Sequence, residues 1–271
     1  PYTGQRYWSI SDLSNYHTQR EDTVKGIKYG AGNGNAALKN VSSIQDLGNH
    51  RVKITYSSKA SEVQNGMCFQ SRPTVRDHAG TFFWKSKDIT MTSLDIHFLH
   101  GFGMVGQHSE NITMDDVDFE APKESGRTTA GYADFVQMSG CKGTINISNC
   151  TFAGPHDDPI NIHGTFNTVT AISSDRRTIT VQYNHNETAG FPNFFEGDEI
   201  EFMTKGNMIT VEDSVRTVTK VDGPDGMGGN MGDGSGSLTT IKLTLNEAVP
   251  SDVQVNQHVV ENITYTPTVN I

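Results

Sequence analysis

Three stretches of the chain repeat one pattern of apolar residues, and this repetition constrains the fold more than any other feature. Apolar side chains stand at relative positions 0, 2, 5 and 7, counted from Ile89, Ile112 and Ile145. The stretches are KDITMTSLDI (87–96), ENITMDDVDF (110–119) and GTINISNCTF (143–152). Short strands that recur at intervals of roughly 20 to 35 residues are typical of a parallel β-helix, in which each coil packs on its neighbours. The pattern predicts an all-β solenoid.

A second strand precedes each repeated stretch. These strands are GMVGQHS (103–109), FVQMSGC (135–141) and PINIHGT (159–165). We align them through one apolar column, made of Val105, Met138 and Ile162. Four residues earlier, this alignment puts Gly101, Asp134 and Asp158 in one column. The two aspartates are therefore expected on adjacent strands, about 4.8 Å apart.

The coil spacing disappears from about residue 166, where short strands alternate with hairpin turns. We expect an inserted small antiparallel β-barrel or sandwich at 166–256. The parallel β-helix then comprises 1–165 and resumes at 257–271, because ENIT at 261–264 repeats the residues at 110–113. Since the chain ends where a coil begins, we expect either further coils beyond it or a partner that covers this end.

The remaining segments are less regular. Three stretches of the first 86 residues are read as the earliest coils, namely RVKITYSS (51–58), GMCFQSR (66–72) and GTFFWKS (80–86). IQDLGNH (44–50) is read as a turn or short helix. The long connection at 120–132 is expected to help build a binding face, as loops of solenoids do.

Charge and composition exclude some functions. The chain has 21 Lys and Arg against 31 Asp and Glu, a net charge of −10, which disfavours a nucleic-acid partner. No apolar run is long enough to span a membrane, and no signal-peptide pattern opens the sequence. Cys68, Cys141 and Cys150 lack the spacing of a metal site or the density of a disulfide scaffold, so we read them as small buried side chains.

The segment HDDP (156–159) crowds two carboxylates together. A single aspartate at such a corner more often caps a turn. Asp134, Asp157 and Asp158 converge within one coil, however, and burying like charges together is costly unless they share a proton or bind a cation. Pro159 favours extended geometry at Asp158, so the two neighbours are expected to point in different directions, with one of them paired with Asp134.

Three carboxylates arranged in this way suit glycoside hydrolysis. In an inverting enzyme one carboxylic acid protonates the leaving oxygen while a carboxylate roughly 6.5 to 9.5 Å away activates water. Asp134 and Asp158 are too close to flank a sugar, but together they can hold one water as a base. Asp157 is the candidate acid.

Neighbouring polar residues are candidates for binding substrate. His156 and His163 bracket the aspartates and are expected to bind sugar hydroxyls or to orient the carboxylates, and Asn161 lies between them. Arg127 could clamp hydroxyls, although a solvated loop arginine explains it equally well. His108 is a further candidate, although taken singly a turn or surface role suits it better. Two histidines with three aspartates could hold a metal, but their spacing is not that of a metal site, so we expect no metal or cofactor.

Residues 100–167 resemble glycoside hydrolase family 110, the α-1,3-galactosidases, most specifically in ADFVQMSGCKG (133–143) and HDDPINIHGT (156–165). The resemblance implies a right-handed parallel β-helix with an inserted β-barrel and a metal-independent inverting mechanism. It implies that Asp157 is the acid and that Asp134 and Asp158 form the base. The expected activity is exo-acting removal of terminal α-1,3-linked galactose from glycans such as the blood group B antigen. The expected partner is a galactose-terminated oligosaccharide, and the expected location is extracellular or periplasmic.

Two other functions remain open from the residues. Pectin-degrading β-helices also use an aspartate, an aspartate pair and a nearby histidine, but the stretch at 156–163 has no arginine or lysine for an acidic uronate. A noncatalytic carbohydrate-binding β-solenoid would carry the same polar residues without turnover. Preference for linear or fucosylated glycans and the oligomeric state are not fixed by these patterns.

Overall fold

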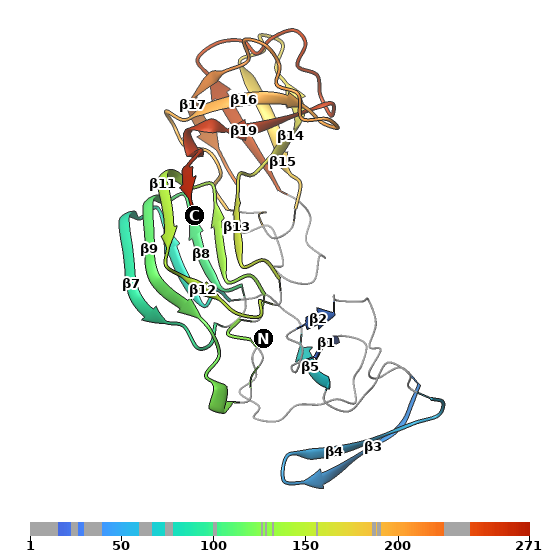
Figure 1. Ribbon diagram of the computed structural model, residues 1–271. Helices are drawn as coiled ribbons and strands as arrows, with labels where there is room; N and C mark the ends of the chain where they lie inside the picture. The colour runs from blue at the N-terminus through green and yellow to red at the C-terminus, as the bar shows by residue number, and fades with distance from the viewer. Residues whose placement is uncertain are drawn as a thin grey trace. The chain divides into compact units, whose positions relative to one another are not determined.

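The computed structural model describes residues 16–22, 27–29, 40–59, 67–73, 78–99, 102–125, 127, 129–131, 133–155, 157–185, 188, 191–224 and 239–271. The chain divides into two compact units. The first comprises Pro1–Val75 with Gly126–Thr128, and the second comprises Arg76–Ser125 with Thr129–Ile271. Figure 1 labels most of the strands of the described residues.

The first unit contains antiparallel strands. β1 (Tyr16–Asp22) pairs with β2 (Ile27–Tyr29) on one side and with β5 (Met67–Pro73) on the other. β3 (Val41–Gly48) and β4 (Arg51–Tyr56) form a hairpin. Its turn residues Asn49 and His50 have φ of 51° and 56°, the left-handed conformation that favours tight hairpins. The prediction that 51–58 and 66–72 form parallel coils is therefore wrong, and 44–50 is a strand and turn.

The second unit contains two parallel sheets. One has the order β13-β10-β8-β6, formed by β6 (Thr81–Trp84), β8 (Met104–Gln107), β10 (Val136–Ser139) and β13 (Ile160–His163). The other contains β7 (Lys87–Asp95), β9 (Glu110–Phe119), β11 (Lys142–Ser148), β12 (Thr151–Phe152) and β20 (Thr268–Asn270). Buried side chains from both sheets, including Val136 and Met138 of one and Ile112 and Ile145 of the other, pack in one core.

The predicted alignment of the repeats is confirmed in the second parallel sheet. Ile112 lies beside Ile89 on one neighbouring strand and beside Ile145 on the other. Phe152 lies beside Phe119, and their rings stack with centroids 5.1 Å apart. The repeated apolar residues therefore mark equivalent positions of successive strands.

The alignment of the first parallel sheet is wrong by one residue at β8. Met138 pairs with Gly106 and with Ile162, whereas Val105 pairs with Gln137. The cause is an irregularity between Lys142 and Ile145, where β11 has one more residue than β9. A fixed spacing back from the repeat therefore misplaces β8. With the observed pairing of Val136 with Met104, the residue aligned with Asp134 is Phe102 and not Gly101.

Six strands close into an antiparallel barrel, coloured yellow to red in Figure 1. They are β14 (Asn167–Ile172), β15 (Thr178–Tyr183), β16 (Glu199–Thr204), β17 (Arg216–Asp222), β18 (Thr240–Leu245) and β19 (His258–Asn262). Alternate residues such as Ile179, Val181 and Tyr183 are fully buried in its core. Glu261 and Asn262 end β19, so the ENIT segment does not resume a coil. The chain rejoins the parallel sheet at β20, where Thr268 pairs with Thr144.

The predicted right-handed parallel β-helix is therefore wrong as the fold class. The protein is all-β, but the described strands form five separate sheets that include a closed barrel and two antiparallel sheets. The repeat signal is confined to the middle of the chain, and strand pairing before and after it is set by hairpin turns. Within the part of the chain that the structure describes, no helix has the length and apolar character needed to cross a membrane.

Candidate active site

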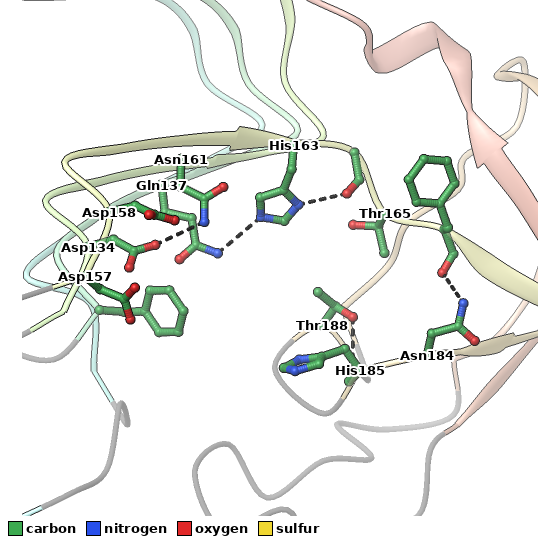
Figure 2. A pocket seen from close by; sticks show the side chains of 13 residues that line it. Asp134, Gln137, Asp157, Asp158, Asn161, His163, Thr165, Asn184, His185 and Thr188 are labelled. Atoms are coloured by element: carbon green, nitrogen blue, oxygen red, sulfur yellow. Dashed lines mark hydrogen bonds between the residues drawn. The ribbon is translucent and has the colours of Figure 1, made fainter. Parts of the chain in front are cut away.

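A cavity of about 380 Å³ opens beside β10 and β13 (Figure 2). The segments just before the two strands supply its carboxylates, the strands supply the amides of Gln137 and Asn161, and residues next to the barrel strands β14 and β15 supply the remaining side. The lining residues are Phe102, Asp134, Gln137, Asp157, Asp158, Asn161, His163, Gly164, Thr165, Phe166, Asn184, His185 and Thr188. Five of the eight residues expected to act at the site line this cavity, namely Asp134, Asp157, Asp158, Asn161 and His163.

Strand pairing brings the aspartates together. The N–H of Phe135 donates to the carbonyl of Asp158 at 3.0 Å, and the N–H of Val136 donates to the carbonyl of Pro159 at 3.2 Å. This parallel pairing holds Asp134 beside Asp158, as the sequence predicted. One carboxylate oxygen of each of Asp134, Asp157 and Asp158 lies within 4.8 Å of the others. Asp157 and Asp158 therefore both lie close to Asp134, whereas the sequence analysis expected only one of them to pair with it.

The three carboxylates differ in exposure. Asp134 is only 2% exposed, whereas Asp157 and Asp158 are exposed. Three negative charges at this separation repel one another, and water screens the repulsion least at the buried member. A shared proton or a water molecule held between two carboxylates relieves this repulsion. Carboxyl groups placed together in this way are the kind of groups that acid and base catalysis uses.

A glycine allows the backbone to pass closely behind Asp134. Gly103 has φ of +76°, and a Cβ built on it would lie 2.0 Å from the carbonyl oxygen of Asp134. The N–H of the next residue, Met104, donates to the carbonyl of Phe135 at 2.9 Å. Only glycine fits between these strands, so this position helps to fix the buried carboxylate.

Amide and imidazole groups line the floor of the cavity. Asn161 Nδ2 donates to Asp134 Oδ2 at 3.2 Å. His163 Nδ1 lies 2.8 Å from the carbonyl oxygen of Gly164, and because a carbonyl only accepts, this nitrogen carries the hydrogen. His163 Nε2 lies 3.3 Å from Gln137 Nε2 and accepts from that amide when the ring is neutral. The histidine is held in one tautomer and one orientation.

Gln137 is a site residue that the sequence analysis missed. It pairs with Asn161 across the parallel strands, and its Oε1 is buried without a hydrogen-bond partner among the described residues. The signal was present, because Gln137 is the polar residue between Val136 and Met138 in an alternating strand. The barrel residues of the lining carry no such signal, since no sequence pattern places the barrel against these strands.

The other candidate residues lie elsewhere. His108 is outside the cavity lining and packs edge-on against Trp84, Phe195 and Tyr265, with ring centroids 5.2, 5.3 and 4.8 Å away. Burial, and then the charge of Lys85, lower its pKa to about 4. Arg127 is exposed and belongs to the first compact unit. His156 lies outside the described residues.

Comparison with known proteins gives the family. No protein-family model matches the chain. A protein named alpha-1,3-galactosidase A from Streptomyces avermitilis is 45% identical over 271 residues, which cover 100% of this chain and 42% of that protein. Proteins of the same name from Peterkaempfera griseoplana and Bacteroides thetaiotaomicron are 40% and 38% identical, over 100% and 82% of this chain and 37% of each relative. The chain spans about two fifths of the length of these relatives. It belongs to the family of proteins named alpha-1,3-galactosidase A.

Proposed function

We propose that the chain carries the catalytic site of an exo-acting, inverting glycoside hydrolase that removes terminal α-1,3-linked galactose. The observation that carries the proposal is the meeting of three carboxylates within 4.8 Å at one end of a polar cavity. The choice of sugar and linkage is supported by relatives that are named alpha-1,3-galactosidase A. Glycans of the blood group B type or linear α-galactosyl glycans, met outside the cell or in the periplasm, are the proposed substrates.

The proposed roles follow from exposure. Asp134 is buried and is held by Asn161, so with Asp158 it can hold the attacking water as a base. Asp157 is exposed and acts as the acid that protonates the leaving oxygen. An inverting acid and base need to be roughly 6.5 to 9.5 Å apart around a sugar, so the proposal requires the carboxyl of Asp157 to move away from the other two when substrate binds. The unpartnered Oε1 of Gln137 is the proposed acceptor for a galactose hydroxyl.

The stereochemical test is proton NMR of the first product of an α-1,3-galactosyl oligosaccharide. An inverting enzyme releases β-galactose, which then mutarotates. Initial release of α-galactose would reject the inverting scheme. Release of an internal fragment from a longer chain would reject exo action.

The acid assignment is tested with Asp157→Asn. This variant should lose turnover of a disaccharide, whose leaving group needs a proton, by about 1,000-fold, and turnover of an aryl galactoside by much less. Asp158→Asn is the matched control, because removing part of the base harms both substrates alike. Equal losses for Asp157→Asn on both substrates would contradict the assignment.

The two alternative functions, a polygalacturonate hydrolase and a noncatalytic binding module, differ from the galactosidase in what they predict. A hydrolase of polygalacturonate needs cations near the substrate, and the cavity lining contains no lysine or arginine among the residues that the structure places there. A noncatalytic binding module keeps the glycan intact after long incubation and tolerates all three aspartate-to-asparagine changes with no loss but affinity. Galactose release that disappears in these variants excludes the binding module.

A further inference from the structure

The cavity extends well beyond the aspartates. Its far side is built by Phe166, Asn184, His185 and Thr188, from the segment that enters the barrel and from the end of β15 and the loop after it. Figure 2 shows His185 and Thr188 apart from the aspartates and across from His163 and Thr165. The barrel is therefore part of the pocket and not only a neighbour of it.

The length of the cavity wall along β13 determines which sugar of the substrate lies beside the barrel. Asp158, Asn161, His163 and Thr165 follow one another along β13 and its extension, and all four line the cavity. At about 3.3 Å per residue, the chain from Asp158 to Thr165 reaches up to about 23 Å, several times the width of a hexose ring. An exo-acting enzyme needs room for only one sugar on the galactose side of the scissile bond. The long arm of the cavity toward the barrel therefore suits the remainder of the glycan.

Hydrogen bonds hold the barrel side of the cavity in a fixed shape. Thr168 Oγ1 donates to Asn184 Oδ1 at 2.6 Å, and Asn184 Nδ2 donates to the carbonyl of Phe166 at 2.8 Å. These contacts tie the entry into the barrel to the end of β15. Thr188 Oγ1 donates to the carbonyl of His185 at 3.1 Å, so these two residues of the cavity lining are held to each other. A wall held in this way is preorganised for a ligand.

We propose that His185 and Thr188 form an acceptor-side subsite that binds the sugar to which the terminal galactose is attached. This inference rests on the proposed galactosidase function and assigns the barrel a role in substrate choice. The imidazole of His185 and the hydroxyl of Thr188 are the hydrogen-bonding groups, and Phe166 supplies a half-buried apolar side chain beside them. The preferred ligand is thus a neutral oligosaccharide of at least two sugars, and not galactose alone.

The kinetic experiment compares two substrates with the same galactose. α-Galactosyl fluoride has a leaving group of one atom that cannot reach the barrel, whereas an α-1,3-galactosyl disaccharide can. The variants His185→Ala and Thr188→Ala should each lower kcat/KM for the disaccharide about 10-fold relative to kcat/KM for the fluoride, the effect of one lost hydrogen bond. Thr219→Ala is the matched control, since Thr219 also donates to a backbone carbonyl but is exposed elsewhere on the barrel. An unchanged ratio in both variants overturns the subsite.

A binding experiment separates this inference from the proposed activity. Titration calorimetry of the Asp157→Asn protein should show tighter binding of the disaccharide than of galactose, and the added change His185→Ala should remove most of that difference. If neither substrate is cleaved by the unchanged protein but the disaccharide still binds through His185, the proposed hydrolysis fails and the subsite stands. If galactose is released but His185→Ala leaves the difference in affinity intact, the subsite fails alone.

Discussion

Asn161 on β13 donates its side-chain amide to the buried carboxylate of Asp134, 3.2 Å away beside the neighbouring strand. The contact crosses the same parallel pairing that aligns Gln137 with Asn161. A charged acceptor and an amide donor in a half-buried setting make one of the stronger kinds of hydrogen bond. Asn161 is therefore a positioning residue for Asp134.

Replacing Asn161 tests this relationship. Asn161→Ala should lower kcat for galactoside hydrolysis by about 100-fold, the usual effect of a misplaced catalytic group, while KM changes less. Asn161→Asp should be worse, because it adds a fourth carboxylate to the cluster. Steady-state kinetics measures kcat and KM of each variant, and thermal unfolding checks that the variant is folded. Asn146→Ala is the control, since Asn146 lies on the other parallel sheet, where its amide oxygen accepts from Asn270 of the neighbouring strand. A fall in kcat for Asn146→Ala equal to that for Asn161→Ala would contradict a specific role.

Gly103 gives a second prediction, on stability. Gly103→Ala places a methyl group 2.0 Å from the carbonyl oxygen of Asp134 at φ +76°. Because the contact is with backbone, it cannot be relieved by a side-chain rotation, and we expect a loss of about 3 kcal/mol in the free energy of unfolding.

Gly197→Ala separates strain from contact in this prediction. Gly197 also has a positive φ, +92°, but nothing lies within 4 Å of its added Cβ. Denaturant unfolding should show a clearly smaller loss for Gly197→Ala than for Gly103→Ala. Similar losses would mean that backbone conformation alone explains the glycine, and that the close approach to Asp134 is unimportant.

The sequence predicted the parts of the site that depend on local strand pairing. The column of Asp134 and Asp158 follows from strands that repeat. Alternating residues such as Ile179 and Val181 predict an antiparallel barrel or sandwich, and the structure shows that it is a closed barrel. The single extra residue in β11 could not be seen in the apolar pattern, so Val105 was aligned in place of Gly106. One-residue errors of this kind exchange the two faces of a strand.

Other features depend on contacts that no local pattern carries. The first unit has strands of acceptable length and composition, but their antiparallel pairing is decided by turns such as that at Asn49. His108 looked like a surface or ligand histidine, and only tertiary packing buries it among aromatic rings. The barrel residues of the cavity, such as His185, come from a separate part of the chain, so their place beside the aspartates could not be predicted.

The carboxylate cluster gives a third prediction, on metal removal. Three oxygens within 4.8 Å of one another have a geometry that a divalent cation can also occupy. We expect the acid and base chemistry to need no cation, so dialysis against EDTA should leave the rate of galactose release unchanged. Added Ca²⁺ or Mg²⁺ should leave the melting temperature unchanged as well, because a bound ion would raise it. Loss of activity that one divalent ion restores would contradict this expectation.

His108 gives the fourth prediction, on pH. Burial of its ring is the main cause, and the positive charge of Lys85 the second, of a pKa lowered from 6.5 to about 4, while Asn193 acts weakly in the opposite direction. The unfolded chain therefore binds a proton at this residue between about pH 6.5 and pH 4, and the folded chain does not. Stability from the uncharged ring is fully present above pH 6.5 and falls as the pH drops through this window. The loss should be on the order of 3 kcal/mol by pH 4.

A variant isolates this effect from that of the carboxylates. His108→Phe keeps an aromatic ring against Trp84 and Tyr265 but has no proton to bind. Urea unfolding should be measured at several pH values between 4 and 7. As the pH is lowered, the free energy of unfolding should fall more steeply in the unchanged protein than in the variant, and the difference in slope should correspond to up to about one bound proton. The carboxylates contribute equally to both proteins and cancel in the comparison. Parallel curves would show that the folded protein accepts a proton at His108 as readily as the unfolded chain does, and that the aromatic cluster does not exclude the charge.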